Sequence, residues 1–85
     1  MSKPEWQKVI VNRIVSLCEK KEITYYELAH VAPVPYHTLL HIVKGESKDP
    51  GIQTIIKICA GLDISLAEFF DTEEFYRMTE EEVEE

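Results

Sequence analysis

Residues 23–45 are I-T-Y-Y-E-L-A-H-V-A-P-V-P-Y-H-T-L-L-H-I-V-K-G, and this stretch predicts two short helices separated by a tight turn. Thr24 stands three residues before Glu27, which is the spacing of a capping box at the start of a helix. Pro33 and Pro35 end the first helix, because a residue that precedes proline avoids the α region. Pro35 can also begin the second helix, where the N–H that proline lacks has no partner to lose.

The second helix of this stretch, from about Pro35 to Lys44, has an apolar stripe. Leu39 and Ile42 lie about one turn apart on one face. Gly45 follows in the position where helices commonly end in a left-handed residue. A short helix, a tight turn and a second short helix are together typical of a DNA-binding helix-turn-helix, whose second helix enters the major groove.

A longer helix is predicted upstream of this stretch and ends near Lys21. Ser2 and Glu5 have capping-box spacing at its start, and Pro4 suits its first turn. The apolar face of this helix carries Trp6, Ile10, Ile14 and Leu17.

Two more helices are predicted after a polar loop at residues 46–50. Gly51 is an acceptable N-cap for the first of them. The apolar residues assigned to that helix are Ile52, Ile55, Ile56, Cys59 and Leu62. Ser65 and Glu68 form another capping box, which opens a short last helix with Leu66, Phe69 and Phe70. Repeated capping boxes support an all-helical fold without reference to any known family.

The length and composition predict one small all-α domain. A chain of 85 residues can bury one modest core, and helices are the economical way to do so. Cys18 and Cys59 are too few for a disulfide framework and fall on helical stripes, so we expect reduced, buried thiols in a cytoplasmic protein. No apolar run is long enough to span a membrane, and the first residues lack the apolar core of a signal peptide.

The net charge of −7 is distributed unevenly along the chain. Residues 1–70 hold eight basic and eight acidic side chains, whereas residues 71–85 hold eight acids and Arg77. The neutral body predicts weaker non-specific DNA binding than a strongly basic domain would have. We expect the tail at 71–85 to be partly helical or disordered, and either a passive solubilising segment or a mild internal competitor of DNA.

From about Ile10 to Phe70 the chain resembles the Cro and lambda-repressor type of helix-turn-helix domain, also called the xenobiotic-response-element family. The resemblance rests on the ungapped spacing of Thr24, Leu28, Ala29, Val34, Leu39, Ile42 and Gly45, and on the run from Pro50 to Phe70. It implies a compact five-helix domain at 1–70, with the helix-turn-helix proper at about 24–44, followed by the short acidic extension. It also implies a prokaryotic or phage transcriptional regulator of the repressor type.

In that family, residues in the first turns of the second motif helix touch base edges in the major groove. The matching positions in this chain are Tyr36, His37, Leu40 and His41. The Tyr36 hydroxyl can bond to a base or a phosphate, and either histidine ring can donate to guanine N7 or O6. Leu40 offers only an apolar contact, for which a thymine methyl is the partner. The simpler alternative is an exposed polar face that has no partner.

Contacts to the DNA backbone are expected on both sides of this helix. Thr24 and Tyr25 match family positions that meet phosphates, although the family usually has Gln where Tyr25 stands. Backbone contacts are also expected from Lys44, Ser47 and Lys48, around the loop after the helix. Glu46 lies among these residues and would repel DNA.

A domain this small buries too little DNA surface for high specificity, so we expect a homodimer on double-stranded DNA with a near-palindromic operator. The half-sites should lie about one helical turn apart, roughly 34 Å. The expected dimer surface is the last helix and the adjoining tail, where Phe69, Phe70, Phe75 and Tyr76 crowd. Some of these aromatic residues must instead close the core.

Besides Tyr25, the chain departs from the family pattern at Pro33, at Asp63 and at the pair Cys18 and Val43. Pro33 stands where the turn usually has Gly, and because proline cannot adopt a positive φ the turn must differ locally. Asp63 replaces another usual Gly, and Asp tolerates the left-handed region better than most residues. Cys18 and Val43 replace an Arg–Glu ion pair that the family often buries, so we expect two buried apolar side chains that lie close together.

The same residues fit a metal site or a catalytic site less well than a DNA-binding surface. His37 and His41 have H-x-x-x-H spacing, but the glutamate of a protease motif is absent and a structural zinc site needs about four ligands. We therefore expect no metal, no cofactor and no catalytic residues, and no small-molecule effector is evident. The main alternative function is a module that binds chiefly protein through Tyr25, Tyr36, Leu40 and the apolar residues of the tail. A regulator of the resembling type is expected in the cytoplasm, associated with the nucleoid.

Overall fold

The structure is a computed structural model, and it describes residues 6–46 and 50–83. Within these residues the chain forms six α-helices and no strand. The helices are α1 Trp6–Lys21, α2 Tyr25–Val31, α3 Tyr36–Val43, α4 Ile52–Leu62, α5 Leu66–Phe69 and α6 Glu73–Val83. The predicted all-α helix-turn-helix class is therefore confirmed, and the acidic extension contributes the sixth helix.

The capping box of α2 is present in both directions. The backbone N–H of Glu27 donates to Oγ1 of Thr24 at 3.1 Å, and the backbone N–H of Thr24 donates to Oε1 of Glu27 at 2.9 Å. At α5 the Ser65 hydroxyl accepts from the backbone N–H of Glu68 at 3.0 Å. These side chains satisfy N–H groups that the first helical turn leaves unpaired. The capping box predicted at residues 2–5 lies outside the described residues.

The turn between α2 and α3 avoids a left-handed residue. Ala32 ends α2 with φ −104° and ψ 74°, and Pro35 precedes α3 with φ −57° and ψ 140°. The helix stops at Val31, so Pro33 lies wholly in the turn, where its fixed φ causes no conflict. This is the local difference that the missing glycine predicts.

Three helices instead end in left-handed residues. Gly45 has φ 77° after α3, and Asp63 has φ 60° after α4, as their positions in the sequence predict. Glu22 has φ 55° after α1, which the sequence does not signal. At all three ends an N–H from beyond the left-handed residue returns to a carbonyl of the last turn, the pattern of a Schellman motif.

The core is formed mainly by α1 to α4. Its fully buried large side chains are Ile14, Leu28, Leu39, Ile55, Ile58, Leu62 and Phe69. Two sequence assignments need correction. Trp6, placed on the apolar face of α1, is exposed. Ile52 and Ile56, placed on the apolar stripe of α4, are 54% and 48% exposed, because α4 turns Ile58 inward instead.

The aromatic residues of α5 and α6 are divided between core and surface. Phe69 is fully buried and Phe75 is 9% exposed, whereas Phe70 is partly buried and Tyr76 is 58% exposed. The Phe70 ring meets the rings of Phe69 and Phe75 edge to face, at centroid distances of 4.9 and 4.8 Å. Burial of Phe75 attaches the first turn of α6 to the domain.

Arg13 ties α1 to the end of α5. Its Nε donates to the carbonyl of Phe69 at 2.7 Å, and its Nη2 donates to the carbonyl of Glu68 at 2.8 Å. The same guanidinium lies 6.0 Å from the centre of the Phe69 ring. Arg13 therefore connects α1 with the end of α5.

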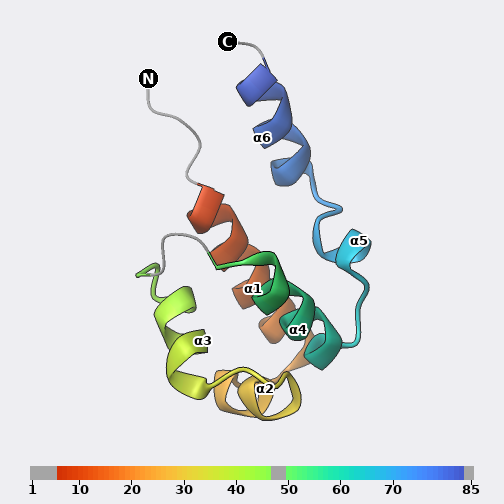
Figure 1. The fold of residues 1–85 in the computed structure, drawn as a ribbon. Helices are drawn as coiled ribbons and strands as arrows, with labels where there is room; N and C mark the ends of the chain where they lie inside the picture. Colours follow the sequence, from red (N-terminus) through yellow and green to blue (C-terminus); the bar gives the residue numbers. More distant parts are fainter. Residues whose placement is uncertain (1–5, 47–49, 84–85) are drawn as a thin grey trace.

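The helices build an elongated molecule of 41 × 24 × 21 Å. Helices α2 and α3 lie toward one end, and α6 extends toward the other (Figure 1). Among the described residues, no helix combines the length and the apolar character that crossing a membrane requires.

Candidate nucleic-acid interface

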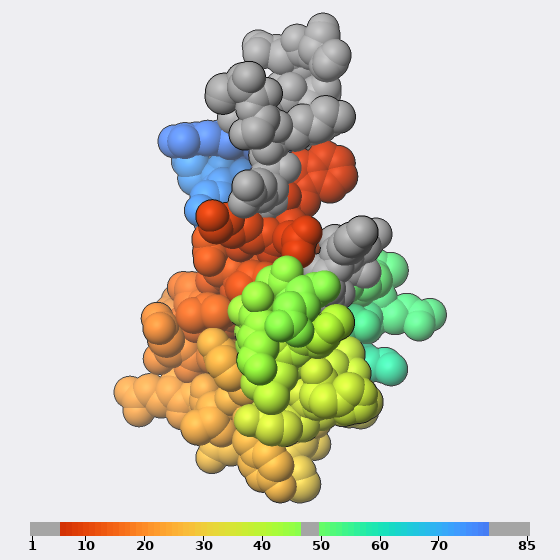
Figure 2. Space-filling view, turned by 90° about the vertical axis from the view of Figure 1, so that its left-hand side faces the viewer, coloured from red at the N-terminus to blue at the C-terminus, as the bar shows by residue number. Residues whose placement is uncertain are grey.

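Helix α3 presents a polar face to solvent. Its inner side is anchored by buried Leu39 and Ile42. On the outer side Tyr36, His37 and His41 are exposed. The surface that α3 forms stands forward on one face of the molecule, with α2 below it and the start of α1 above it (Figure 2). The helix is therefore anchored through its buried side, and its polar side chains are exposed on the opposite side.

Leu40 differs from the other three predicted base-contacting residues. It is half-buried, so only part of its side chain is available to a thymine methyl. The amphipathic pattern of α3 thus brings Tyr36, His37 and His41 to one exposed side, with Leu40 at its margin.

The place of α3 depends on a close approach between α2 and α4. A Cβ built on Gly61 of α4 would lie 2.5 Å from Cβ of Ala32 and 3.0 Å from its Cα. Ala32 is fully buried at the end of α2. Because only a residue without a side chain fits there, Gly61 lets the end of α2, and hence the turn into α3, sit directly on α4.

Three aromatic rings connect the outer face of α2 with the start of α3. The Tyr26 and Tyr36 rings meet edge to face, with centroids 5.4 Å apart and an interplanar angle of 81°. The His30 ring stacks beside Tyr26 with centroids 6.2 Å apart and an angle of 26°. We did not identify Tyr26 or His30 as functional candidates from sequence, although their i, i+4 spacing puts them on one side of α2.

The far end of α3 carries a contact between an imidazole and a carboxylate. Nε2 of His41 lies 3.3 Å from Oε1 of Glu46, and both side chains are largely exposed. The Glu46 backbone N–H also donates to the His41 carbonyl at 3.0 Å. The carboxylate is therefore held beside a predicted base-contacting ring.

The predicted backbone-contacting residues differ in their surroundings. Thr24 is exposed, but its hydroxyl already accepts the capping hydrogen bond from Glu27. Tyr25 is half-buried against the core, and burial, followed by the nearby Cys18 and Glu19, raises the pKa of its hydroxyl. Lys44 is exposed. Ser47 and Lys48 lie outside the described residues.

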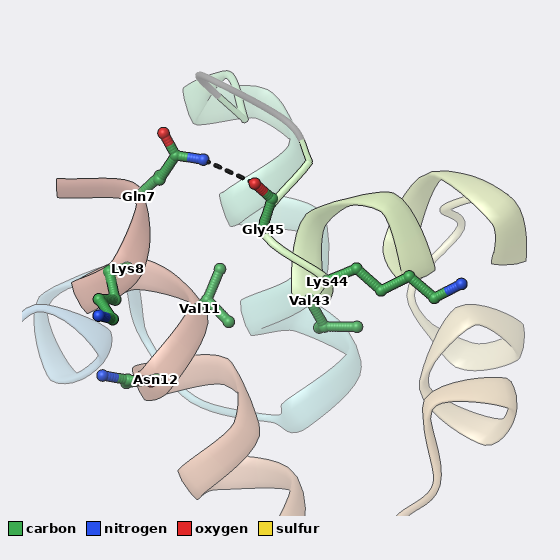
Figure 3. A pocket seen from close by; sticks show the side chains of 7 residues that line it. All are labelled: Gln7, Lys8, Val11, Asn12, Val43, Lys44 and Gly45. Atoms are coloured by element: carbon green, nitrogen blue, oxygen red, sulfur yellow. Dashed lines mark hydrogen bonds between the residues drawn. The ribbon is translucent and has the colours of Figure 1, made fainter. Parts of the chain in front are cut away.

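A shallow groove of about 340 Å³ separates the end of α3 from the start of α1. Nε2 of Gln7 donates to the Gly45 carbonyl across it at 3.0 Å, and Lys44 points away from α1 (Figure 3). Val11 and Val43 line the groove between these contacts. The Gln7 hydrogen bond thus fixes the loop after α3, while the Lys44 ammonium is directed outward.

Val43 corrects one expectation about the core. Cys18 is buried as predicted, and burial raises the pKa of its thiol. Val43 is only half-buried, because it packs on the edge of the core and lines the groove beside Val11. Of the two residues that replace the ion pair of the family, Cys18 is therefore buried as expected, whereas Val43 is only partly buried.

Among the described residues, no group of three or more His, Cys, Asp or Glu side chains is arranged to hold a metal ion. His41, one of the two histidines of the H-x-x-x-H spacing, is paired with Glu46. Both cysteines are free and buried. The polar groups on α3 are thus hydrogen-bonding groups on an open surface.

Comparisons with known proteins agree with this geometry. A family model described as a Cro/C1-type helix-turn-helix DNA-binding domain matches residues 13–74. The crystal structure of the prophage Lp1 protein 11 is similar to this chain, with a TM-score of 0.75 and 28% sequence identity. That similarity covers 87% of this chain and 96% of the prophage protein chain. A comparison with curated proteins found no match.

Proposed function

Because the chain belongs to the Cro/C1-type helix-turn-helix DNA-binding family, we propose that it is a sequence-specific, repressor-like transcriptional regulator that inserts α3 into the major groove. DNA binding is the role of the family. To this we add a preference for particular DNA sequences and repressor-like regulation. The observation that carries it is the exposure of Tyr36, His37 and His41 together on α3, above a buried Leu39 and Ile42.

Each exposed side chain has a chemistry that base edges can use. A histidine ring offers an N–H to guanine N7 or O6, and a tyrosine hydroxyl can donate or accept. Leu40 supplies a smaller apolar contact at the margin. The Lys44 ammonium, which is directed away from α1, supplies a positive charge for a DNA phosphate at the edge of the major groove. The remaining contacts to the DNA backbone are proposed for Thr24, Tyr25, Ser47 and Lys48.

We propose that the regulator acts as a homodimer on a near-palindromic site. One short helix reads few base pairs, so two copies with half-sites about one helical turn apart, roughly 34 Å, are needed for useful specificity. Two exposed apolar surfaces are candidates for the dimer contact. One includes Tyr76 on α6, which belongs to the dimer surface expected from the sequence, and the other is the pair Ile52 and Ile56 on α4. Sedimentation that detects only monomer, free and on DNA, would contradict the dimer.

Selection of bound sequences from a random pool of duplex DNA is the direct test of this function. A regulator of the proposed kind should enrich a two-fold symmetric site. His37→Ala should then relax the preference at the base pair that this residue contacts, because a good base contact discriminates by about 1–3 kcal/mol. Its thermal midpoint should stay near wild type, because His37 is exposed in the free protein.

Lys44→Ala is the matched comparison for His37→Ala. It should weaken binding to all sequences alike and lower the slope of log affinity against log salt by about 1, because it removes one phosphate contact. Failure of the pool to yield any enriched sequence, with full-length folded protein at low salt, would refute the proposed specificity.

A protein-binding module is the second candidate function, and one observation favours it. Exposed apolar side chains occur on α2 as well as on α4, with Tyr26 63% and Val31 56% exposed. Salt dependence discriminates the two functions, since affinity for DNA falls steeply as salt rises and apolar protein association does not.

A further inference from the structure

We propose that Tyr26 is a positioning residue that fixes the ring of Tyr36 for base recognition and thereby helps to determine sequence preference. The inference rests on the proposed function of α3 and adds to it a residue on the neighbouring helix. Tyr26 itself need not touch a base, because its effect passes through the ring of Tyr36.

The geometry of the two rings supports this role. Their centroids lie 5.4 Å apart and their planes meet at 81°, which is the edge-to-face arrangement that aromatic pairs prefer. The edge of an aromatic ring is positive and its face is negative, so the contact has a preferred direction as well as a preferred distance. Tyr26 therefore restricts where the Tyr36 ring can point.

Tyr36 needs such a neighbour because of its place in α3. It is the first residue of the helix and is 43% exposed. Pro35 before it offers no side-chain hydrogen bond to the helix start. An exposed tyrosine with no packing partner samples several side-chain rotamers, and ordering it on DNA costs free energy. Contact with Tyr26 already restricts the Tyr36 side chain in the free protein, so less conformational entropy is lost when DNA binds.

His30 supports Tyr26 from its own helix. The two residues are one turn apart on α2, and their rings stack with centroids 6.2 Å apart. Tyr26 thus has ring contacts with both His30 and Tyr36, although it remains 63% exposed. The row of rings runs from α2 to α3 across the turn, outside the buried core.

The test uses the full chain and the DNA site obtained from the random pool. Tyr26→Leu removes the ring but keeps an apolar side chain that favours helix. We expect it to weaken binding to the selected site by on the order of two- to tenfold, which is the size of an aromatic pair contact. The loss should be concentrated at the base pair whose preference Tyr36→Leu also relaxes. The salt slope should stay unchanged, because no phosphate contact is removed.

Three further variants separate positioning from other roles. Tyr26→Phe keeps the ring and should therefore keep the DNA sequence preference of the wild-type protein. The double variant Tyr26→Leu/Tyr36→Leu should be no worse than Tyr36→Leu alone, because the first residue acts through the second. Trp6→Leu removes an exposed aromatic side chain at the start of α1, outside this row of rings, and should leave binding unchanged. Additive losses in the double variant, or a defect in Tyr26→Phe equal to that in Tyr26→Leu, would overturn the proposal.

A measurement without DNA separates this inference from the proposed function. In the free protein, ring currents from Tyr26 should displace the aromatic proton resonances of Tyr36, and the displacement should vanish in Tyr26→Leu but remain in Tyr26→Phe. Absence of the displacement in the wild-type protein would refute the positioning contact itself. A displacement in a protein that selects no DNA sequence would instead show that the proposed function had failed, and the specificity role with it.

Discussion

Nε2 of His41 faces Oε1 of Glu46 at 3.3 Å, and the backbone keeps the two residues together. His41 lies in the last turn of α3, and Glu46 follows the left-handed Gly45. The Glu46 N–H returns to the His41 carbonyl as part of the Schellman motif. The carboxylate is thus built into the proposed DNA-binding face, where it occupies the ring nitrogen that a base would use and opposes an approaching phosphate.

The first prediction is that Glu46→Gln binds DNA more tightly than wild type. Both side chains are more than half exposed, so the pair itself is worth little, roughly 0.2–1 kcal/mol. We expect a gain of about two- to fivefold at low salt, shrinking as salt rises. In a His41→Ala background the gain should be smaller, if Glu46 acts through the ring. An equal gain in both backgrounds would show that the carboxylate only repels DNA.

The second prediction concerns the contact between Gly61 and Ala32. In Gly61→Ala the new Cβ would lie 2.5 Å from Cβ of Ala32, so the end of α2 must shift. Overpacking costs about 1–3 kcal/mol, and better helix propensity returns less than about 1 kcal/mol. We expect a lower thermal midpoint, since 1 kcal/mol shifts it by about 4–8 °C in a domain of this size.

Gly51→Ala is the control for that substitution, because nothing lies within 4 Å of its added Cβ. It should cost no more than a weakened N-cap, about 0.5–1 kcal/mol. A Gly61→Ala protein as stable as wild type would mean that α2 and α4 are not held in this close contact.

Local signals account for the parts of the fold that the sequence predicts well. The Thr24–Glu27 box, Gly45 and Asp63 act within one helical turn of themselves, so their neighbours in sequence decide the outcome. The turn at Pro33 is also local, because a fixed φ excludes the usual glycine conformation. The exposed positions on α3 follow from its short apolar stripe.

Tertiary context decides the parts that the sequence does not predict. Helix α4 contains four isoleucines, and not all of them can lie on one face. Periodicity alone permits two arrangements, one with Ile52 and Ile56 inward and one with Ile58 inward. The Tyr26–Tyr36 contact joins two helices across a turn whose geometry no single residue specifies. Phe75 stands directly after two acids, and its burial depends on a partner cluster formed by Phe69 and Phe70.

The third prediction concerns the site where the family often has a buried ion pair. Cys18 is 3% exposed, so Cys18→Arg should place an uncompensated charge in the core and cost about 3–5 kcal/mol. Val43 is half-buried, and Val43→Glu should cost less, about 1 kcal/mol, because its carboxylate can reach solvent through the groove. Urea unfolding of both variants measures the difference.

The double variant Cys18→Arg/Val43→Glu tests whether the two positions are neighbours. A cycle should give a favourable coupling of about 0.5–3 kcal/mol if the arginine reaches the glutamate. Strictly additive losses would show that these residues do not meet, and would change the alignment of α3 with the family pattern.

The fourth prediction compares two adjacent aromatic residues of α6. Phe75 is 9% exposed and packs with Phe69 and Phe70, whereas Tyr76 is 58% exposed and its hydroxyl donates to Asp71. Phe75→Ala should cost about 3–5 kcal/mol, and Tyr76→Ala should cost far less because its ring is exposed. Equal, small effects on the midpoint of denaturation would show that α6 is not part of the cooperative domain.

The last prediction concerns the acidic end of the chain. A deletion after Phe70 would remove Phe75 and confuse charge with stability, so the informative deletion begins after Met78. It keeps Phe75 and Met78, which pack on the core, and removes five of the eight acids in the tail. Helix α6 extends toward the end of the molecule opposite α2 (Figure 1). At about 0.1 M salt, exposed charges farther apart than about 10 Å are largely screened.

We therefore expect this shortened chain to bind DNA as tightly as the full chain at both low and high salt, with an unchanged salt slope. Its solubility at high concentration should fall, because acidic side chains keep small domains apart. Tighter binding confined to low salt would instead identify the acids as an internal competitor for Lys44 and Lys48. The comparison is valid only if the shortened chain keeps its thermal midpoint and, by sedimentation, its oligomeric state. A lost dimer would weaken DNA binding and conceal a release of inhibition.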